Sequence, residues 1–255
     1  MPRCIECGFD IARIVHPETE MVEKCPTCGR CCDKYYEFAC VQKWIDVAIL
    51  ERRAWIHVVF NQTNILPSLL LAALISCLVE AYVVRTTSVY ALLQRKSVYL
   101  EKSIIENTST LESLQIVRNL RPDMIPLMMY WSTWPALFLY ACTEYLLSLV
   151  AAIWLGVQLK RGVDGGEDDA VMITWAKSVS LAHTAKLGYL LFLVWRIPIP
   201  LVVVVDFVFL LWTIRGFSIT ANHTTRFFAF IAVSVCLLTR VIFRHVTGWS
   251  PQLIF

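Results

Sequence analysis

The chain has 255 residues, of which 57% are hydrophobic and only 17% are charged, and its mean hydropathy is +0.59. A charged fraction this far below the quarter or so found in soluble domains predicts an integral membrane protein and excludes an ordinary soluble domain. The net charge of +3 is small and the basic residues are dispersed, which argues against binding to nucleic acid.

Residues 1–33 are polar and rich in turns, and they are predicted to form a small zinc-ribbon-like module. Its cysteines make the pattern C-x2-C-x17-C-x2-C, within the range of four-thiolate zinc sites, at Cys4, Cys7, Cys25 and Cys28. Two residues between cysteines allow one tight turn to direct both sulfurs at one ion, and Gly8 and Gly29 follow the pairs. Four thiolates leave no place for a reactive water, so one structural zinc ion is expected.

Other fates of these cysteines remain open in the sequence. The alternative to a metal site is a pair of disulfides or free buried thiols. Seven of the ten cysteines lie in the first 40 residues, an odd number that favours metal thiolates in a reducing compartment, so the module is expected to face the cytosol. Cys31 is a competing ligand three residues after Cys28, while Cys32 is expected to be buried and His16 to lie at the surface.

Residues 34–63 are predicted to form an amphipathic helix in the membrane interface. Polar side chains recur near helical spacing, at Gln42, Lys43, Asp46, Arg53, His57 and Asn61. Aromatic and aliphatic residues occupy most of the remaining surface. A helix with so much apolar surface fits the bilayer interface better than water.

Residues 64–255 are predicted to form a helical membrane domain of about four spans, with five as the alternative. The spans are expected near residues 64–84, 131–159, 181–214 and 227–243. Pro198 and Pro200 interrupt the third of these, which is expected to be a helical hairpin or a broken helix. Residues 85–130 are expected to be an amphipathic helix, and the glycosylation sequon at Asn107 would be lumenal if the N-terminus is cytosolic.

Three acidic residues fall in the predicted spans, namely Glu80, Glu144 and Asp206. A charge in hydrocarbon costs a few kcal/mol, so each one needs a partner or a function. They are interpreted as a polar lining that accommodates lipid head groups, or as structural residues that form interhelical hydrogen bonds, reach the membrane surface from a span end (Glu80) or lie at the turn of a hairpin. Arg240 is expected to extend to the membrane surface. A third interpretation, an intramembrane enzyme that uses two of these acids with His183, has no nucleophile, metalloprotease or phosphate-loop motif to support it. The protein is therefore not expected to be an enzyme.

Several further motifs follow the cysteine pairs, and together they resemble a known family. They are "DKYYE" at 33–37, "IDVAIL" at 45–50 and "HVVFN" at 57–61, the last directly before the first predicted span. With Gly8 and Pro26 beside the cysteines, this combination is similar to the homology domain of the Arv family of endoplasmic-reticulum membrane proteins. The resemblance covers about the first quarter of the chain, and it departs at "CC" (31–32), at "ACVQKW" (39–44) and at Trp55-Ile56.

The resemblance implies an endoplasmic-reticulum protein that moves or distributes sterols, influences sphingolipid levels and supports synthesis of glycosylphosphatidylinositol anchors. Its partners would be membrane lipids, and they would be sterols, sphingolipids or anchor precursors. The alternative is an adaptor whose zinc module binds a membrane enzyme of lipid synthesis. No nucleic-acid partner is expected, and the sequence defines no oligomeric state.

Overall fold

The computed structural model describes residues 2–18, 21–37, 40–105, 134–161, 168–191, 202–221 and 226–247, which are almost entirely helical after residue 33. In the described part of the N-terminal module, backbone pairing is limited to three isolated β-bridges: Arg3 with Asp10, Val15 with Val22, and Lys24 with Cys31. Strands are therefore absent from that part, and the expected ribbon is reduced to these single bridges.

Residues 34–63 differ from the single helix expected there. They form the short turn η1 (Lys34–Tyr36), α1 (Cys40–Ala48), α2 (Arg52–Ile56), the π-helical turn η2 (His57–Asn61) and η3 (Thr63–Ile65). The break after α1 occurs at Leu50, which has a left-handed φ of 65°. A left-handed residue just past a helix ends it and redirects the chain, so α2 sets off in a new direction.

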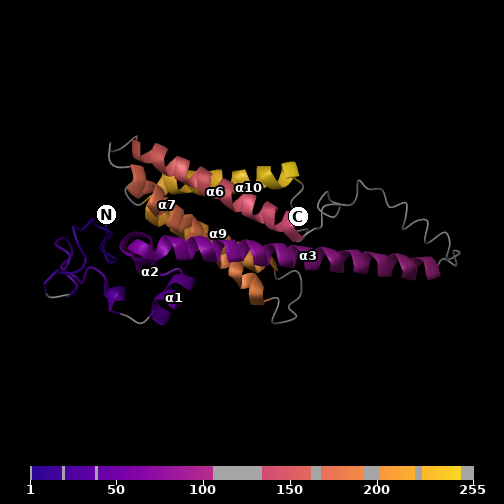
Figure 1. Ribbon diagram of the computed structural model, residues 1–255, viewed down its shortest axis with the longest axis horizontal. Helices are drawn as coiled ribbons and strands as arrows, with labels where there is room; N and C mark the ends of the chain where they lie inside the picture. The colour runs from indigo at the N-terminus through magenta and orange to yellow at the C-terminus, as the bar shows by residue number, and fades with distance from the viewer. Residues whose placement is uncertain are drawn as a thin grey trace.

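The membrane domain contains α3 (Leu66–Ile105), α6 (Trp134–Arg161), α7 (Asp168–His183), η5 (Thr184–Tyr189), α9 (Val202–Thr220) and α10 (Arg226–Thr247). In the described residues, three helical stretches are long and apolar enough to cross a membrane: Thr63–Arg85, Trp134–Gln158 and Ala229–Thr247. They coincide with three of the predicted spans. A count of four spans is not confirmed. In Figure 1, α3 runs along the whole bundle and continues well past the other helices.

Helix α7 lies at the centre of the bundle, where it contacts α3, α6 and α9. Every residue from Trp175 to His183 is buried, so this helix has no solvent or lipid face over more than two turns. It begins well before residue 181, where the sequence suggested the start of an apolar stretch, and continues into η5. Residues 192–201, with Pro198 and Pro200, lie outside the described residues, as does Asn107.

Two apolar cores hold the molecule together. The first fills the bundle and contains many small side chains, which allow the helices to approach closely: Ala73, Cys77, Ala81, Ala141, Ala152 and Ala232. The second core joins the N-terminal module to the bundle, since Ile5, Trp55 and Val58 share it with Leu181 and Ile219. Residues 2–62, called the cap below, are therefore packed into the bundle rather than tethered to it.

Candidate metal centre and buried charges

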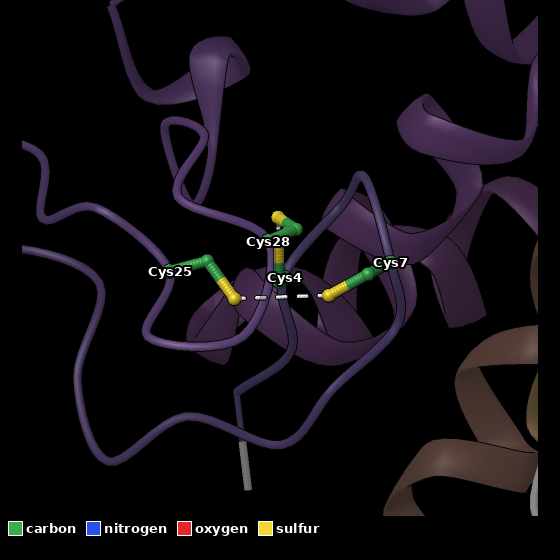
Figure 2. Close-up of side chains that lie close together, drawn as sticks. All are labelled: Cys4, Cys7, Cys25 and Cys28. Atoms are coloured by element: carbon green, nitrogen blue, oxygen red, sulfur yellow. Dashed lines mark hydrogen bonds between the residues drawn. The ribbon is translucent and has the colours of Figure 1, made fainter.

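Four cysteine sulfurs converge between two loops of the cap. Figure 2 shows the side chains of Cys4, Cys7, Cys25 and Cys28 pointing toward one another. The Sγ atoms of Cys4 and Cys28 are 3.8 Å apart, those of Cys7 and Cys25 are 3.7 Å apart, and all four lie within 4.8 Å. A tetrahedron with zinc–sulfur bonds of about 2.3 Å has edges of about 3.8 Å, so the arrangement fits one such ion.

The two loops have the same backbone design. In the first, Gly8 N–H donates to the carbonyl of Cys4, and in the second Gly29 N–H donates to the carbonyl of Cys25. Both glycines have left-handed φ angles, 83° and 70°, which a residue with a Cβ adopts only at a cost. The glycine after each pair is thus what allows the chain to turn and present two sulfurs on one side.

The thiols of the cluster have unequal proton affinities. Burial raises the pKa of Cys4 to about 12, and it also raises the pKa of Cys7. Burial acts in the same direction on Cys25, but hydrogen bonds from the backbone of Cys28 and Thr27 outweigh it and lower that pKa to about 6. A divalent cation would replace the remaining protons and stabilise all four thiolates, which is the chemistry of a structural metal site.

The remaining cysteines of the cap lie outside this cluster. Cys31 is exposed and is not part of the group, whereas Cys32 is buried beside Cys4 and Cys25 in a small core of the cap. The sulfurs that converge are therefore those of the two C-x-x-C-G pairs. The side chain of His16 is partly exposed and also lies outside the group.

A buried polar network connects the metal loops to the end of the cap. Asp33 is fully buried, and its Oδ2 accepts hydrogen bonds from His57 Nδ1 at 2.7 Å and from Asn61 Nδ2 at 2.6 Å. Asn61 in turn exchanges hydrogen bonds with the backbone of Arg3, next to Cys4. Asp33 belongs to the "DKYYE" motif and His57 and Asn61 to the "HVVFN" motif, and the spacing of the two motifs in the sequence does not by itself predict this contact.

Two cations of the bundle bind backbone carbonyls of the cap. Lys177 on α7 donates to the carbonyl oxygen of Gln62, and Arg215 on α9 donates through two nitrogens to that of Leu50. Leu50 is the left-handed residue that ends α1, so Arg215 stabilises the corner on which α2 depends. Together with the shared core, these bonds fix the cap against α7 and α9.

Inside the bundle, two of the predicted acids face basic partners. Glu80 Oε2 accepts from Lys186 Nζ at 2.5 Å, and Glu144 Oε1 accepts from Arg240 Nε at 2.5 Å. Lys186 also lies 4.0 Å from Glu144, so the four residues, called the charge cluster below, form one connected group from α3, α6, η5 and α10. Arg240 turns inward to this group rather than toward the membrane surface.

The 3-10 helix η5 aligns the polar residues near the cluster. With three residues per turn, His183, Lys186 and Tyr189 fall in one row. His183 Nε2 lies 3.4 Å from Cys77 Sγ, and Tyr189 OH donates to Asp206 Oδ1 at 2.9 Å. Asp206 thus has a partner of its own, and within the described part of the chain it forms no hydrogen bond with the charge cluster. Lys186 was not singled out from the sequence, although a lysine inside the predicted span 181–214 is a signal of a buried partner.

Comparison with known proteins places the chain in a family. The model of the Arv1-like family matches residues 3–217. The chain belongs to the Arv1-like family. The match extends far beyond the N-terminal quarter that carried the resemblance, and it includes three members of the charge cluster but not Arg240.

Among curated proteins, Protein ARV1 of Candida albicans (strain SC5314 / ATCC MYA-2876) is 31% identical over 65 residues. Those residues are 24% of this chain and 22% of that protein, so this Arv1-like chain matches only about a fifth of the relative's length. No solved structure matches the chain.

Proposed function

We propose that this Arv1-like protein resides in the endoplasmic reticulum, moves or distributes sterols and related lipids without catalysing a reaction, and thereby affects sphingolipid levels and anchor synthesis. Membership of the family supports the lipid role. The mechanism is supported by the position of Ile5. This residue lies between Cys4 and Cys7 in the sequence, and its side chain is fully buried in the core that the cap shares with the bundle. Folding of the cysteine loops and packing of the bundle are therefore linked.

In this proposal, the cap holds one zinc ion through Cys4, Cys7, Cys25 and Cys28 and faces the cytosol. The zinc has a structural role, because metal binding supplies folding free energy to a module with little core of its own. The hydrogen bonds of Asp33 to His57 and Asn61 then connect the ordered loops to η2, and η2 leads through η3 directly into α3.

Helix α1 is proposed to lie in the membrane interface. Its exposed side carries large apolar residues, with Val41, Trp44 and Ile45 exposed and Ile49 exposed directly after its last residue, while Val47 on the opposite side is buried. The helix contacts α2, which is close in sequence to the start of the first candidate span. An apolar face at that level is satisfied by the boundary between head groups and acyl chains.

The test is sterol transfer between liposomes by the purified protein. We expect transfer that is lost on chelation and in a Cys4→Ser/Cys7→Ser variant, because the cap then unfolds and its contacts with α7 and α9 are broken. Cys31→Ser is the matched control, since this exposed cysteine lies outside the cluster, and it should behave as the native protein. Full transfer by the metal-free protein would refute the role given to the cap.

An adaptor for a membrane enzyme of lipid synthesis is the second candidate. The exposed apolar side of α1 favours it, because such a face can also pack against a helix of a partner. The liposome experiment separates the two functions. Only a protein that moves lipid itself transfers sterol when no partner is present.

A further inference from the structure

Arg240 closes the charge cluster on the side of α10 and is its most accessible member. Its side chain is 12% exposed, whereas those of Lys186, Glu80 and Glu144 are at most 2% exposed. Its Nε donates to Glu144. Among the described residues, neither terminal nitrogen of this guanidinium has a hydrogen-bond acceptor, and an arginine carries four N–H groups on those two atoms.

Three members of the cluster, Glu80, Glu144 and Arg240, each lie in one of the three candidate membrane spans. Arg85, whose guanidinium is 5.3 Å from the ring centroid of Trp134, marks the membrane boundary at one end of α3 and α6. At 1.5 Å per residue, Glu80 lies about 8 Å and Glu144 about 15 Å inside that boundary. Water is scarce at this depth, and donors without an acceptor are costly, so the terminal nitrogens of Arg240 require one from outside the described protein.

A phosphate group meets this requirement better than other membrane components. The planar fork of a guanidinium matches two phosphate oxygens at once, and the bonds are charge-assisted. Sterols offer one hydroxyl, which cannot satisfy the fork. Phe209, whose ring centroid is 4.5 Å from the guanidinium, covers one face of it, so a ligand must approach at the edge where the free nitrogens point.

Glu144 is placed to give way to such a ligand. Its Oε1 lies 2.5 Å from Arg240 Nε and 4.0 Å from Lys186 Nζ. If a phosphate engages Arg240, Glu144 can turn to Lys186 and keep a cationic partner. Displacement therefore leaves no carboxylate unpaired in the membrane, which would otherwise oppose binding.

We propose that Arg240 binds the phosphate of a phosphate-bearing membrane lipid, and that Glu144 occupies the guanidinium when no such lipid is bound. The inference rests on the lipid function proposed above and adds a ligand class to it. The site selects lipids that carry a phosphate over diacylglycerol and sterols. Because Arg240 lies inside a candidate span, the bound head group would lie within the bilayer rather than at its surface.

The test measures retained lipid by native mass spectrometry of the full chain. Dioleoyl phosphatidic acid is compared with dioleoylglycerol, which has the same acyl chains and no phosphate. The native protein should retain the phosphatidic acid selectively, and Arg240→Gln should retain roughly tenfold less or lower, as expected for loss of a charge-assisted bidentate contact. Glu144→Gln should retain more, because the competing carboxylate is gone.

A double variant controls for the possibility that Arg240→Gln alone does not fold. Glu144→Gln/Arg240→Gln removes both charges, leaves the Glu80–Lys186 pair, and should fold and still lose the selectivity. Equal retention of the two lipids by the native protein, or undiminished selectivity in the folded double variant, would overturn the inference. Displacement by millimolar inorganic phosphate would assign the site to a soluble anion and overturn the lipid assignment. Sterol transfer by a protein that does not prefer phosphatidic acid over dioleoylglycerol would refute this inference alone. A preference for phosphatidic acid without transfer of any lipid would refute only the proposed function.

Discussion

Replacement of Ile5 by alanine tests the link between the cysteine loops and the bundle. The side chain of Ile5 is fully buried, in one core with Trp55, Leu181 and Ile219. Its truncation removes three carbon atoms, worth about 2.4 kcal/mol in lost transfer free energy at about 0.8 kcal/mol per group. The cavity that remains adds to this, so the protein should lose about 2–5 kcal/mol of stability.

The loss of stability in Ile5→Ala should be detectable in the bundle, whose residues are far from the cysteine cluster in the sequence. Hydrogen exchange measured by mass spectrometry in detergent should show faster exchange in residues 175–189 and 212–221 of Ile5→Ala, with metal content determined on the same samples. Val22→Ala is the matched control. Val22 packs in the separate core of the cap around Cys4 and Cys25, so its truncation should loosen the cap and leave exchange in the bundle nearly unchanged.

Altered metal retention in Ile5→Ala, with exchange in α7 and α9 at native rates, would refute the link between the cysteine loops and the bundle. The cap would then be an independent module that only touches the bundle. An Ile5→Val variant should fall between, with a loss of about 0.5–1.5 kcal/mol.

Three more predictions concern the contact between α7 and α9, the charge cluster and the metal. A Cβ at Gly216 would lie 2.4 Å from Ser178 Oγ, so Gly216→Ala should lower the free energy of unfolding by about 1–3 kcal/mol, and adding Ser178→Ala should restore part of that loss. Thermal unfolding measures both variants, and an unchanged melting temperature of Gly216→Ala would contradict this contact. Lys186→Met should lower the free energy of unfolding by about 3–5 kcal/mol and Glu80→Gln/Lys186→Met by much less, because only the single variant leaves the buried Glu80 carboxylate without Lys186. Equal losses of stability in the two variants would argue against the pair. The thiols with raised pKa values, Cys4 at about 12 and Cys7, must both lose a proton to bind zinc, so zinc affinity should fall at least about 100-fold from pH 8 to pH 7. Competition with a chelator measures this affinity, and a flat pH profile would exclude the proton release.

The local parts of the site follow from the sequence, because their spacing is fixed by short-range geometry. A C-x-x-C-G pair makes its turn with its own backbone, and the 17 intervening residues only have to return the chain to the same place. The three candidate spans were predicted for a similar reason, since length and apolarity alone define them.

The polar partners could not be assigned in the same way. Helix α7 is buried on all sides from Trp175 to His183, so this part has no polar outer face to produce a helical pattern, and residues 168–180 fell outside the predicted spans. The pairing of Glu80 with Lys186 depends on how two helices pack, and that packing is set by distant small residues. Asp33 and His57 stood in recognisable motifs, but only the turn at Leu50 brings them together.

The uninterrupted length of α3 has a mechanical consequence. The helix continues from Arg85 to Ile105, and 20 residues of helix extend about 30 Å, as far as the hydrocarbon core is thick. Its first turn adjoins the cap, and its far end projects past the rest of the bundle (Figure 1). A rod of this length acts as a lever: a tilt of a few degrees at its first turn, beside the cap, becomes a displacement of several ångströms at Ile105, so a rearrangement of the cap moves the far end of the helix more than the near end.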